Sequence, residues 1–358
     1  MAYTTINKST DYFETLLSTG DDGSQTFTGL DFQPDFVWSK RRQTHAHQLY
    51  DSVRTAGSGK ALQSESSAAE GGDGGTYGYL SSFTSDGFAS TAGSSNNNYF
   101  NASGGTYAFW NWKAGTTSGI VQGGASITPS AYSFNQTSGF SIIKYQGTGA
   151  NATVPHGLNA VPKMILFKSL ANSISWIVYS SQLNISSSNC LRLNGTNAAF
   201  TESAWNGTRP TTSVFSLGTH NEANNNSGET IAYCFADIQG YSKFSSYTGN
   251  GNADGTFVYT GFKPAWVMVK KYSSTSGWYI NDTARDPFNG TYGNDASLFA
   301  NTNGAEFTSA SLNVDMLSNG FKLRSNNSEV NGDTYTYIYM AFAEAPLVGS
   351  NGVTAKAR

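Results

Sequence analysis

Histidines and acidic–basic pairs are the residues of this chain whose types and spacing could do chemistry. His45 and His47 are two residues apart, so in a strand they would face one side, where a metal ion could bridge them. No cysteine and no clear third ligand follow in the local sequence, and the polar loop around them is typical of a solvated segment. We therefore predict no metal site here.

Paired carboxylates would be the signature of a glycosidase. Asp51 is followed three residues later by Arg54, and Asp282 is followed in the same way by Arg285. Because a catalytic pair is expected in one copy, we interpret both as structural salt bridges. The chain also lacks a Gly-x-Ser-x-Gly elbow, a phosphate loop and a His-Glu-x-x-His motif. We predict no enzymatic activity, no catalytic residues and no cofactor.

Two further patterns leave alternatives open. Asn250 to Gly255 places oxygen-bearing side chains before a glycine as a calcium loop does, but its twelfth position is Gly261, where an EF-hand needs glutamate. We favour a turn, with calcium as the alternative. Cys190 and Cys234 could form a disulfide, which synthesis in a cytoplasm disfavours.

Tryptophans in or next to polar loops could stack on a sugar ring if an indole face is exposed. The candidates are Trp176, Trp205 and Trp278. Core packing is the favoured interpretation for each, because large aromatic side chains are usually buried.

Two loops rich in Asn, Ser and Gly are a second candidate binding surface, since short polar side chains adapt to a ligand at low entropic cost. Their asparagines are Asn96, Asn97, Asn98, Asn224, Asn225 and Asn226. The same composition is also typical of ordinary connections between strands.

A segment that occurs three times predicts the elements that position these residues. Each copy reads Pro, any residue, three large apolar residues, any residue and Lys. A short apolar run entered through proline predicts a buried strand. We call the three copies the repeat strands, and they lie at 34–40, 162–168 and 264–270.

Other features recur around each repeat strand. Upstream, two strand-like runs flank a glycine-rich turn and are predicted to form a hairpin; the turns lie at 20–23, 147–149 and 249–251. Downstream, a run of aromatic residues ends each copy, and we call these runs, at 107–112, 231–235 and 335–342, the closing strands.

The repeats predict the domain organisation. We expect three modules, a linker rich in Ser, Thr and Gly that holds one strand at most, and a short tail. In order along the chain these are module 1 (1–115), the linker (116–139), module 2 (140–241), module 3 (242–346) and the tail (347–358).

Composition predicts the fold class. Aromatic residues make up 14% of the 358 residues and charged residues 13%, with 39 Gly against 8 Pro. Abundant Tyr, Phe, Ser, Thr and Asn without an apolar period of 3.6 residues indicates β-sheets joined by turns. Modules of about 100 residues suit antiparallel β-sandwiches of jelly-roll or lectin-like kind. We predict an all-β chain of three such modules with almost no helix.

Charge and hydropathy argue against two classes of partner. The net charge is −3, and no basic cluster exists beyond residues 40–42, so binding to a phosphate backbone is not expected. No run approaches the roughly 18 to 20 apolar residues that span a bilayer. The N-terminus has no basic segment followed by an apolar core. We predict no nucleic-acid partner, no membrane insertion and no export signal.

Several segments resemble a repeat family found in virion proteins of marine tailed bacteriophages. They are 12–17, 29–38, 49–54, 85–88 and 110–114 in the first half, and 232–236, 240–244, 318–324 and 337–344 in the second. The resemblance covers nearly the whole chain. It implies a phage structural protein, tail-fibre-like or with lectin-like sandwiches, and it brings no catalytic residues.

From this resemblance we expect a virion surface protein, made in the host bacterial cytoplasm, that contributes to recognising a host-surface glycan. The alternative is a capsid decoration or cement protein that stabilises the shell, and a glycan-degrading tailspike is a third possibility. Expected partners are other virion proteins of the tail or capsid and further copies of the chain. Multimerisation is expected because few charges and many Tyr and Phe suit subunit contacts. The resemblance favours a trimer, because phage fibres are commonly trimers.

Overall fold

The computed structural model describes residues 3–289, 295–309 and 311–348. The helices among these residues are short: α1 (Gly74–Tyr77), α2 (Asn221–Asn224) and the 3₁₀ turns η1 (Ser9–Asp11) and η2 (Ile185–Ser187). Within the same described ranges, none has the length and hydropathy needed to cross a bilayer. Nearly all other regular structure is antiparallel strand, which confirms the prediction of an all-β sandwich-type chain.

Module 1 has an inner and an outer sheet in its described residues. The inner sheet has the order β1-β7-β3-β4, from β1 (Phe13–Thr19), β7 (Thr106–Trp112), β3 (Phe36–Arg41) and β4 (Gln48–Asp51). The outer sheet has the order β2-β6-β5, from β2 (Gln25–Thr28), β6 (Gly87–Thr91) and β5 (Tyr79–Thr84).

Module 2 repeats this plan and takes in part of the linker. Its inner sheet has the order β14-β13-β12-β11-β16-β9-β8, from β14 (Phe200–Thr201), β13 (Asn189–Arg192), β12 (Ile177–Ser180), β11 (Pro162–Ser169), β16 (Glu229–Ala236), β9 (Phe140–Gln146) and β8 (Ala131–Asn135). Its outer sheet pairs β10 (Ala152–Pro155) with β15 (Val214–Leu217). The strand β8 lies in the predicted linker and extends this sheet by pairing with β9.

Module 3 follows the same plan. Its inner sheet has the order β17-β25-β19-β20-β21-β22, from β17 (Ser242–Thr248), β25 (Thr336–Pro346), β19 (Phe262–Lys271), β20 (Trp278–Asp282), β21 (Ala296–Phe299) and β22 (Phe307–Thr308). Its outer sheet has the order β18-β24-β23, from β18 (Phe257–Tyr259), β24 (Gly320–Leu323) and β23 (Val314–Leu317).

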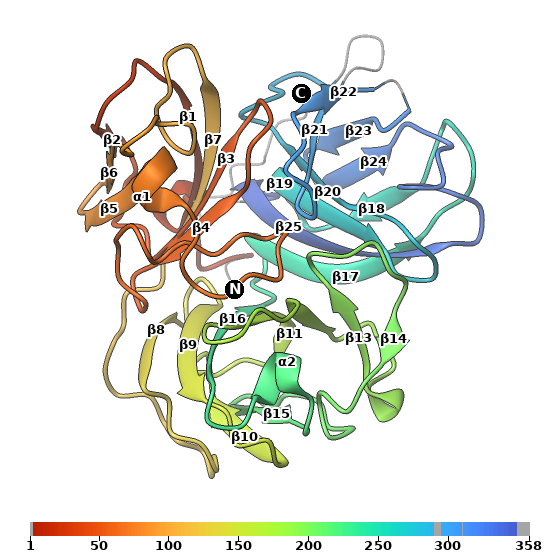
Figure 1. Cartoon of the computed structure of the whole chain (residues 1–358). Helices are drawn as coiled ribbons and strands as arrows, with labels where there is room; N and C mark the ends of the chain where they lie inside the picture. The colour runs from red at the N-terminus through yellow and green to blue at the C-terminus, as the bar shows by residue number, and fades with distance from the viewer. Residues whose placement is uncertain (1–2, 290–294, 310, 349–358) are drawn as a thin grey trace.

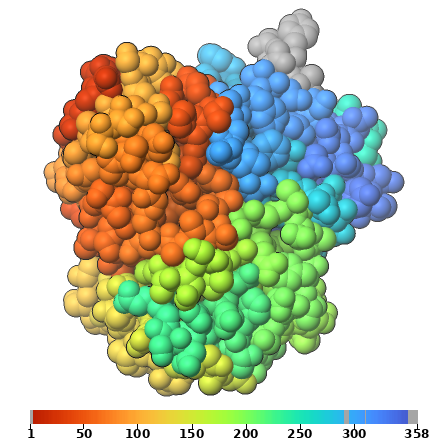
Figure 2. All heavy atoms as spheres, in the orientation of Figure 1, coloured from red at the N-terminus to blue at the C-terminus, as the bar shows by residue number. Residues whose placement is uncertain are grey.

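The three inner sheets meet around a common centre (Figure 1). One continuous cluster of buried side chains, which we call the central core, takes residues from all three modules. Each module also has a core of its own between its inner and outer sheets. Figure 2 shows the modules, orange, yellow-green and blue, in close contact with one another. The chain therefore forms one body with approximate threefold repetition.

The repeat strands explain this double burial. In β3, Phe36 and Trp38 point into the central core, while Val37 between them packs in the core of module 1. Met164 and Leu166 of β11 alternate in the same way with Ile165. Successive side chains of a strand point to opposite faces, so a strand buried on both faces needs consecutive large apolar residues.

The glycine-rich turns do not join hairpins, and that prediction was wrong. β1 pairs with β7 and β2 pairs with β6, so the turn at 20–23 carries the chain from the inner sheet to the outer sheet. Glycine is needed there because the backbone passes close to another segment. A Cβ on Gly20 would lie 2.1 Å from the Ala102 carbonyl oxygen, and one on Gly249 would lie 2.2 Å from that of Gly332.

Candidate functional site

The first Asp-x-x-Arg motif joins module 1 to module 2. Arg54 Nε lies 2.5 Å from Asp51 Oδ2, and both side chains are buried. The hydroxyl of Tyr233, on β16, donates to the same Asp51 oxygen at 2.6 Å. Asp51 Oδ1 accepts from the Arg54 backbone N–H at 2.8 Å. Because both carboxylate oxygens are engaged, Asp51 binds the two modules together and is not free for catalysis.

The second motif joins module 3 to module 1 in the same way. Arg285 Nε lies 2.6 Å from Asp282 Oδ2, again with both side chains buried. The indole nitrogen of Trp110, on β7, donates to Asp282 Oδ2 at 3.0 Å, and Glu306 accepts from Arg285 at 2.8 Å. The prediction of structural salt bridges is confirmed at both places.

The boundary between modules 2 and 3 has neither charge. Phe36, Met164 and Trp266 hold the same position in the three repeat strands. The strand registers pair them with Asp51, Ser180 and Asp282, so these three partners are equivalent. Three residues on from Ser180, the position of the arginine holds Leu183, which is buried in the central core. At these equivalent positions, two boundaries are thus polar and one is apolar.

The three predicted sugar-stacking tryptophans are all buried. Trp176 is 0% exposed, and Trp205 and Trp278 are each 1% exposed. The prediction of core packing is confirmed, and no indole face among the three is available to stack on a sugar ring. Their nitrogens donate to backbone oxygens: Trp176 to Gln63 at 2.9 Å, Trp278 to Arg192 at 2.9 Å and Trp205 to Asn189 at 3.1 Å.

The Trp176 and Trp278 contacts cross module boundaries, and His47 makes the equivalent contact at the third boundary. The strand registers place His47 where modules 2 and 3 have Trp176 and Trp278. Its Nε2 lies 2.9 Å from the Phe299 oxygen of module 3, and its Nδ1 accepts from the Trp38 indole at 2.8 Å. Both ring nitrogens are therefore occupied. Burial lowers the pKa of His47 well below its ordinary value, so the imidazole is neutral.

His45 does not share a strand face with His47, because it lies in the bend before β4. Within the described ranges, no group of three or more His, Cys, Asp or Glu side chains is placed to hold a metal ion. In the calcium-like turn, the side-chain oxygens of Asn250 and Asn252 accept from backbone N–H groups of the turn itself, at 3.1 and 2.9 Å. Those oxygens stabilise a turn, as the favoured interpretation had it.

The lysines that end the repeat strands were not foreseen as a special group. Lys40, Lys168 and Lys270 are each 0% exposed, and each donates to backbone oxygens of a following loop, at 2.9 Å for Lys40 to Gln43. Burial lowers the pKa of Lys40 and of Lys168 to about 8, and that of Lys270 to about 7. The repetition of these lysines in the sequence was the signal that could have identified them as a group. Their role is to hold the loops that follow the repeat strands.

The predicted asparagine loops divide into structural and exposed positions. Asn224 is fully buried, and its side-chain nitrogen donates to the Ala150 and Gly218 oxygens at 2.6 and 2.7 Å. Asn97 is also buried, whereas Asn96, Asn98 and Asn225 are half-buried and Asn226 is exposed. Buried Asn101 and Asn331 brace the glycine-rich turns of modules 1 and 3 as Asn224 does in module 2. We call these three residues the asparagine clamps.

The cysteines are not joined. Cys190 and Cys234 are both free and buried, on β13 and β16. Burial raises the pKa of the Cys190 thiol to about 12, so it is not a reactive thiolate.

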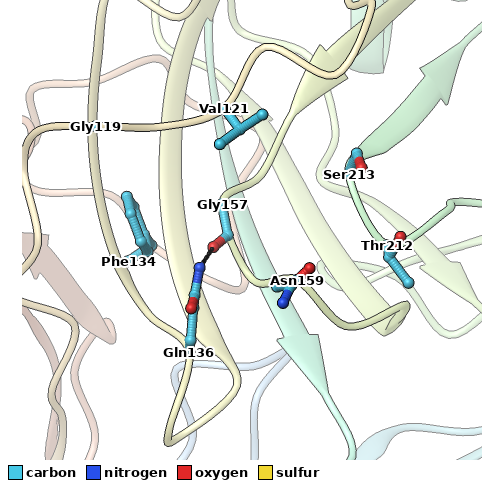
Figure 3. A pocket seen from close by; sticks show the side chains of 8 residues that line it. All are labelled: Gly119, Val121, Phe134, Gln136, Gly157, Asn159, Thr212 and Ser213. Atoms are coloured by element: carbon cyan, nitrogen blue, oxygen red, sulfur yellow. Dashed lines mark hydrogen bonds between the residues drawn. The ribbon is translucent and has the colours of Figure 1, made fainter.

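A hollow on module 2 is the candidate binding site (Figure 3). Its volume is about 260 Å³, and it lies where the linker passes the loops beside β10 and β15. Figure 3 shows Phe134 and Gln136 on one side and Thr212 and Ser213 on the other, with Asn159 between them. Its lining residues are Gly119, Val121, Phe134, Gln136, Gly157, Asn159, Thr212 and Ser213.

This hollow offers hydrogen bonds without charge, because none of its lining side chains ionises. Gln136 Nε2 donates to the Gly157 oxygen at 2.9 Å, which fixes one wall. Val121 is 73% exposed and supplies an apolar surface. Sequence reasoning missed this site, since the segments that form it are far apart in the chain and carry only an ordinary Ser/Thr/Gly composition.

One family comparison bears on this chain. A family model described as "Domain of unknown function (DUF7483)" matches residues 8–346, so the chain belongs to that family. A search of curated proteins gives no match.

Proposed function

We propose that this member of the DUF7483 family is a non-enzymatic bacteriophage virion surface protein, tail-fibre-like in role, which contributes to recognising a host-surface glycan. The virion location rests on the resemblance of its repeats to phage virion proteins. The ligand class rests on the hollow of module 2. Its expected partners are other virion proteins of the tail or capsid and further copies of the chain, with a trimer favoured.

The observation that carries the ligand class is a hollow that combines uncharged hydrogen-bonding groups with apolar surface. Gln136, Asn159 and Thr212 can donate to and accept from hydroxyl groups. Val121, which is 73% exposed, offers carbon surface to the apolar face of a sugar ring. At about 260 Å³ the hollow is just below the usual range of about 300–1,000 Å³ for small-molecule sites, which suits one unit of a longer glycan.

The surroundings of the hollow suit a binding site. Binding loops work best on a rigid support, and here the loops start from β8, β10 and β15, which are paired strands. The fused cores leave little freedom between modules. A ligand would therefore meet a site that is largely preformed.

Binding of purified host polysaccharide and a set of neutral oligosaccharides, measured by calorimetry, tests the proposal. A hydrogen bond contributes about 0.5–1.5 kcal/mol, so Asn159→Ala and Thr212→Val should each weaken binding by up to roughly tenfold. Asn226→Ala is the matched control, because Asn226 is an exposed loop asparagine outside the hollow. Equal losses in all three variants, or no glycan binding at saturating concentration, would contradict the proposed ligand.

A capsid decoration protein is the second candidate, and one observation favours it. The approximate threefold repetition of the body presents three related modules around a common centre, which would match three subunits around a local threefold axis of a shell. Such a protein should occur in copy numbers near that of the major capsid protein, and its loss should make particles less resistant to heat.

A glycan-degrading tailspike has less support. Asp51 and Asp282 are held in buried ion pairs. Asp282 and Asp286 line a hollow of only about 10 Å³, which has no room for a sugar and a water molecule. If the chain released reducing sugar from host polysaccharide, the non-enzymatic proposal would be wrong.

A further inference from the structure

The first strand of each module has one edge that a further strand can occupy, and only module 2 fills it within the described chain. β1, β9 and β17 are equivalent, because each pairs antiparallel with the closing strand of its module. In module 2 the second edge of β9 is taken by β8, antiparallel. Among the described residues, β1 and β17 stand at the ends of their sheets.

The backbone geometry shows which groups β1 offers at its open edge. At its two ends, Lys113 N–H donates to the Tyr12 oxygen at 2.9 Å and Gly20 N–H donates to the Gly105 oxygen at 2.7 Å. Hydrogen-bonded pairs alternate along an antiparallel ladder. The even-numbered residues of β1 therefore bond to β7, and the N–H and C=O groups of Thr15 and Leu17 point away from the sheet.

In module 2 the equivalent groups hold β8. The register with the closing strands makes Ile142 equivalent to Thr15 and Lys144 equivalent to Leu17. Ile142 pairs with Ser133 of β8, and the Lys144 oxygen accepts from Ser130 N–H at 2.8 Å. The chain itself thus shows how an extended segment seats at this place.

A groove of about 210 Å³ lies along the open edge of β1, at the boundary with module 3. Its lining residues are Thr10, Phe13, Glu14, Thr15, Ala265, Thr283, Ala284, Ala343 and Glu344. At the boundary of modules 1 and 2, β8 occupies the equivalent strand edge, where the Ser133 hydroxyl lies 3.3 Å from Asp35 Oδ1, and a hollow of about 460 Å³ remains beside it. At the remaining boundary the Ser246 hydroxyl of β17 donates to Gln182 Oε1 at 2.9 Å, so a side-chain contact spans the equivalent place.

The groove has a chemical preference because it contains unpaired polar atoms. Glu14 Oε2 and Thr15 Oγ1 are buried, and neither has a hydrogen-bond partner among the described residues. Glu14 is equivalent to Ser141, which lies opposite Phe134 of β8. An added strand would therefore place one side chain directly opposite a carboxylate, and opposite charges across a strand pair stabilise it.

We propose that the groove beside β1 binds an extended segment of a partner polypeptide, which adds to β1 as an antiparallel strand and places a Lys or Arg opposite Glu14. Backbone groups of Thr15 and Leu17 supply the affinity, and Glu14 selects the cationic side chain. Side chains opposite Leu16 and Leu17 would be apolar, as Tyr132 and Ala131 are in β8. The groove is separate from the glycan hollow, so this docking site stands whether or not a glycan binds.

A peptide based on β8 tests the proposal on the full chain. The probe is the sequence of residues 130–137 with Phe134→Lys, and the matched probe carries Phe134→Glu. Hydrogen exchange should show protection of the Thr15 and Leu17 amides by the Lys peptide, and fluorescence anisotropy should show at least tenfold tighter binding of the Lys peptide than of the Glu peptide. Glu14→Gln should remove most of that difference.

Leu17→Pro should weaken binding of the Lys peptide at least tenfold while β1 stays paired with β7, because an edge strand tolerates proline where its N–H points away from the sheet. Ser246→Pro, at the equivalent position of β17, is the matched control and should leave binding unchanged. Unchanged binding in Leu17→Pro, or no preference between the two peptides, would overturn the proposal. Protection of Thr15 and Leu17 that rises with protein concentration in the absence of peptide would assign the groove to a second copy and also overturn it.

Discussion

The polar and apolar module boundaries are built at equivalent positions of the same backbone frame. Where Asp51 pairs with Arg54, the next module supplies the hydroxyl of Tyr233. In module 3, Met340 occupies the position equivalent to Tyr233. At the boundary of modules 2 and 3, Leu183 of module 2 stands in the position of the arginine. A buried ion pair is tolerated only when its remaining hydrogen-bonding capacity is met. Each boundary is therefore specified by a set of three side chains.

Replacing one member of the polar set Asp51, Arg54 and Tyr233 should have the largest effect on stability. Arg54→Leu leaves Asp51 charged and buried, so it should reduce the free energy of unfolding by about 3–5 kcal/mol. Urea denaturation measures this. Arg324→Leu is the control, because Arg324 forms an exposed pair with Asp315 and such pairs contribute about 1 kcal/mol or less.

Replacing the whole set sharpens the comparison. Asp51→Ser combined with Arg54→Leu and Tyr233→Met copies the side chains of the apolar boundary. Exchanging a buried ion pair for apolar groups of similar volume is often neutral, so the triple variant should recover most of the stability lost in Arg54→Leu. A triple variant as unstable as the single one would show that the boundaries are not interchangeable.

Unlike the boundary residues, the asparagine clamps should contribute equally to the stability of each module, because all three modules share them. Asn101, Asn224 and Asn331 are each fully buried and brace equivalent turns. Replacing any one with alanine leaves buried backbone groups unpaired, at about 1–3 kcal/mol for each variant. The three losses measured by denaturation should agree within about 1 kcal/mol; a loss confined to one module would contradict the equivalence of the repeats.

The smallest predicted effect is the pH dependence of stability that His47 causes. Burial lowers its folded pKa well below the ordinary value, while the unfolded chain takes up a proton near pH 6.5. The contribution of neutral His47 to the free energy of unfolding is thus complete above that pH and is lost as the pH falls below it. From pH 7.5 to 5.5 the loss should be about 1.4 kcal/mol.

A double variant isolates this contribution. Trp38→Leu with His47→Trp copies the side-chain pair of Leu166 and Trp176 in module 2. Burial also lowers the pKa of His156 to about 4 and raises the pKa of Glu65, which accepts from the His47 backbone N–H, to about 7, and both effects stay in the variant. From pH 7.5 to 5.5 the wild type should therefore lose about 1.4 kcal/mol of stability relative to the double variant, and parallel curves would refute the role of His47.

Sequence alone predicted the parts of the fold that rest on local pattern. The consecutive apolar residues around Val37 and Ile165 identified buried strands, and the copied Asp-x-x-Arg motifs identified structural pairs. The glycine-rich turns were misread, because a turn between two sheets uses the same residues as a hairpin. What separates them is whether β1 and β2 share a ladder, and that depends on distant partners.

The binding surfaces were less accessible to sequence reasoning. Trp176 and Trp278 lie next to polar loops, but their indoles reach across module boundaries that no local pattern indicates. The hollow collects Gln136, Asn159 and Thr212 from segments far apart in the chain. Its lack of charge also gives it no motif, so only the folded arrangement shows it.

The most direct test of a virion-borne glycan binder is to locate and count the chain on intact particles, with gold-labelled antibody and quantitative mass spectrometry against the major capsid protein. The proposal predicts label at the tail, at a few dozen copies or fewer. Label spread over the shell at copy numbers near that of the capsid protein would contradict it and favour a decoration protein. Absence of the chain from purified particles would contradict both.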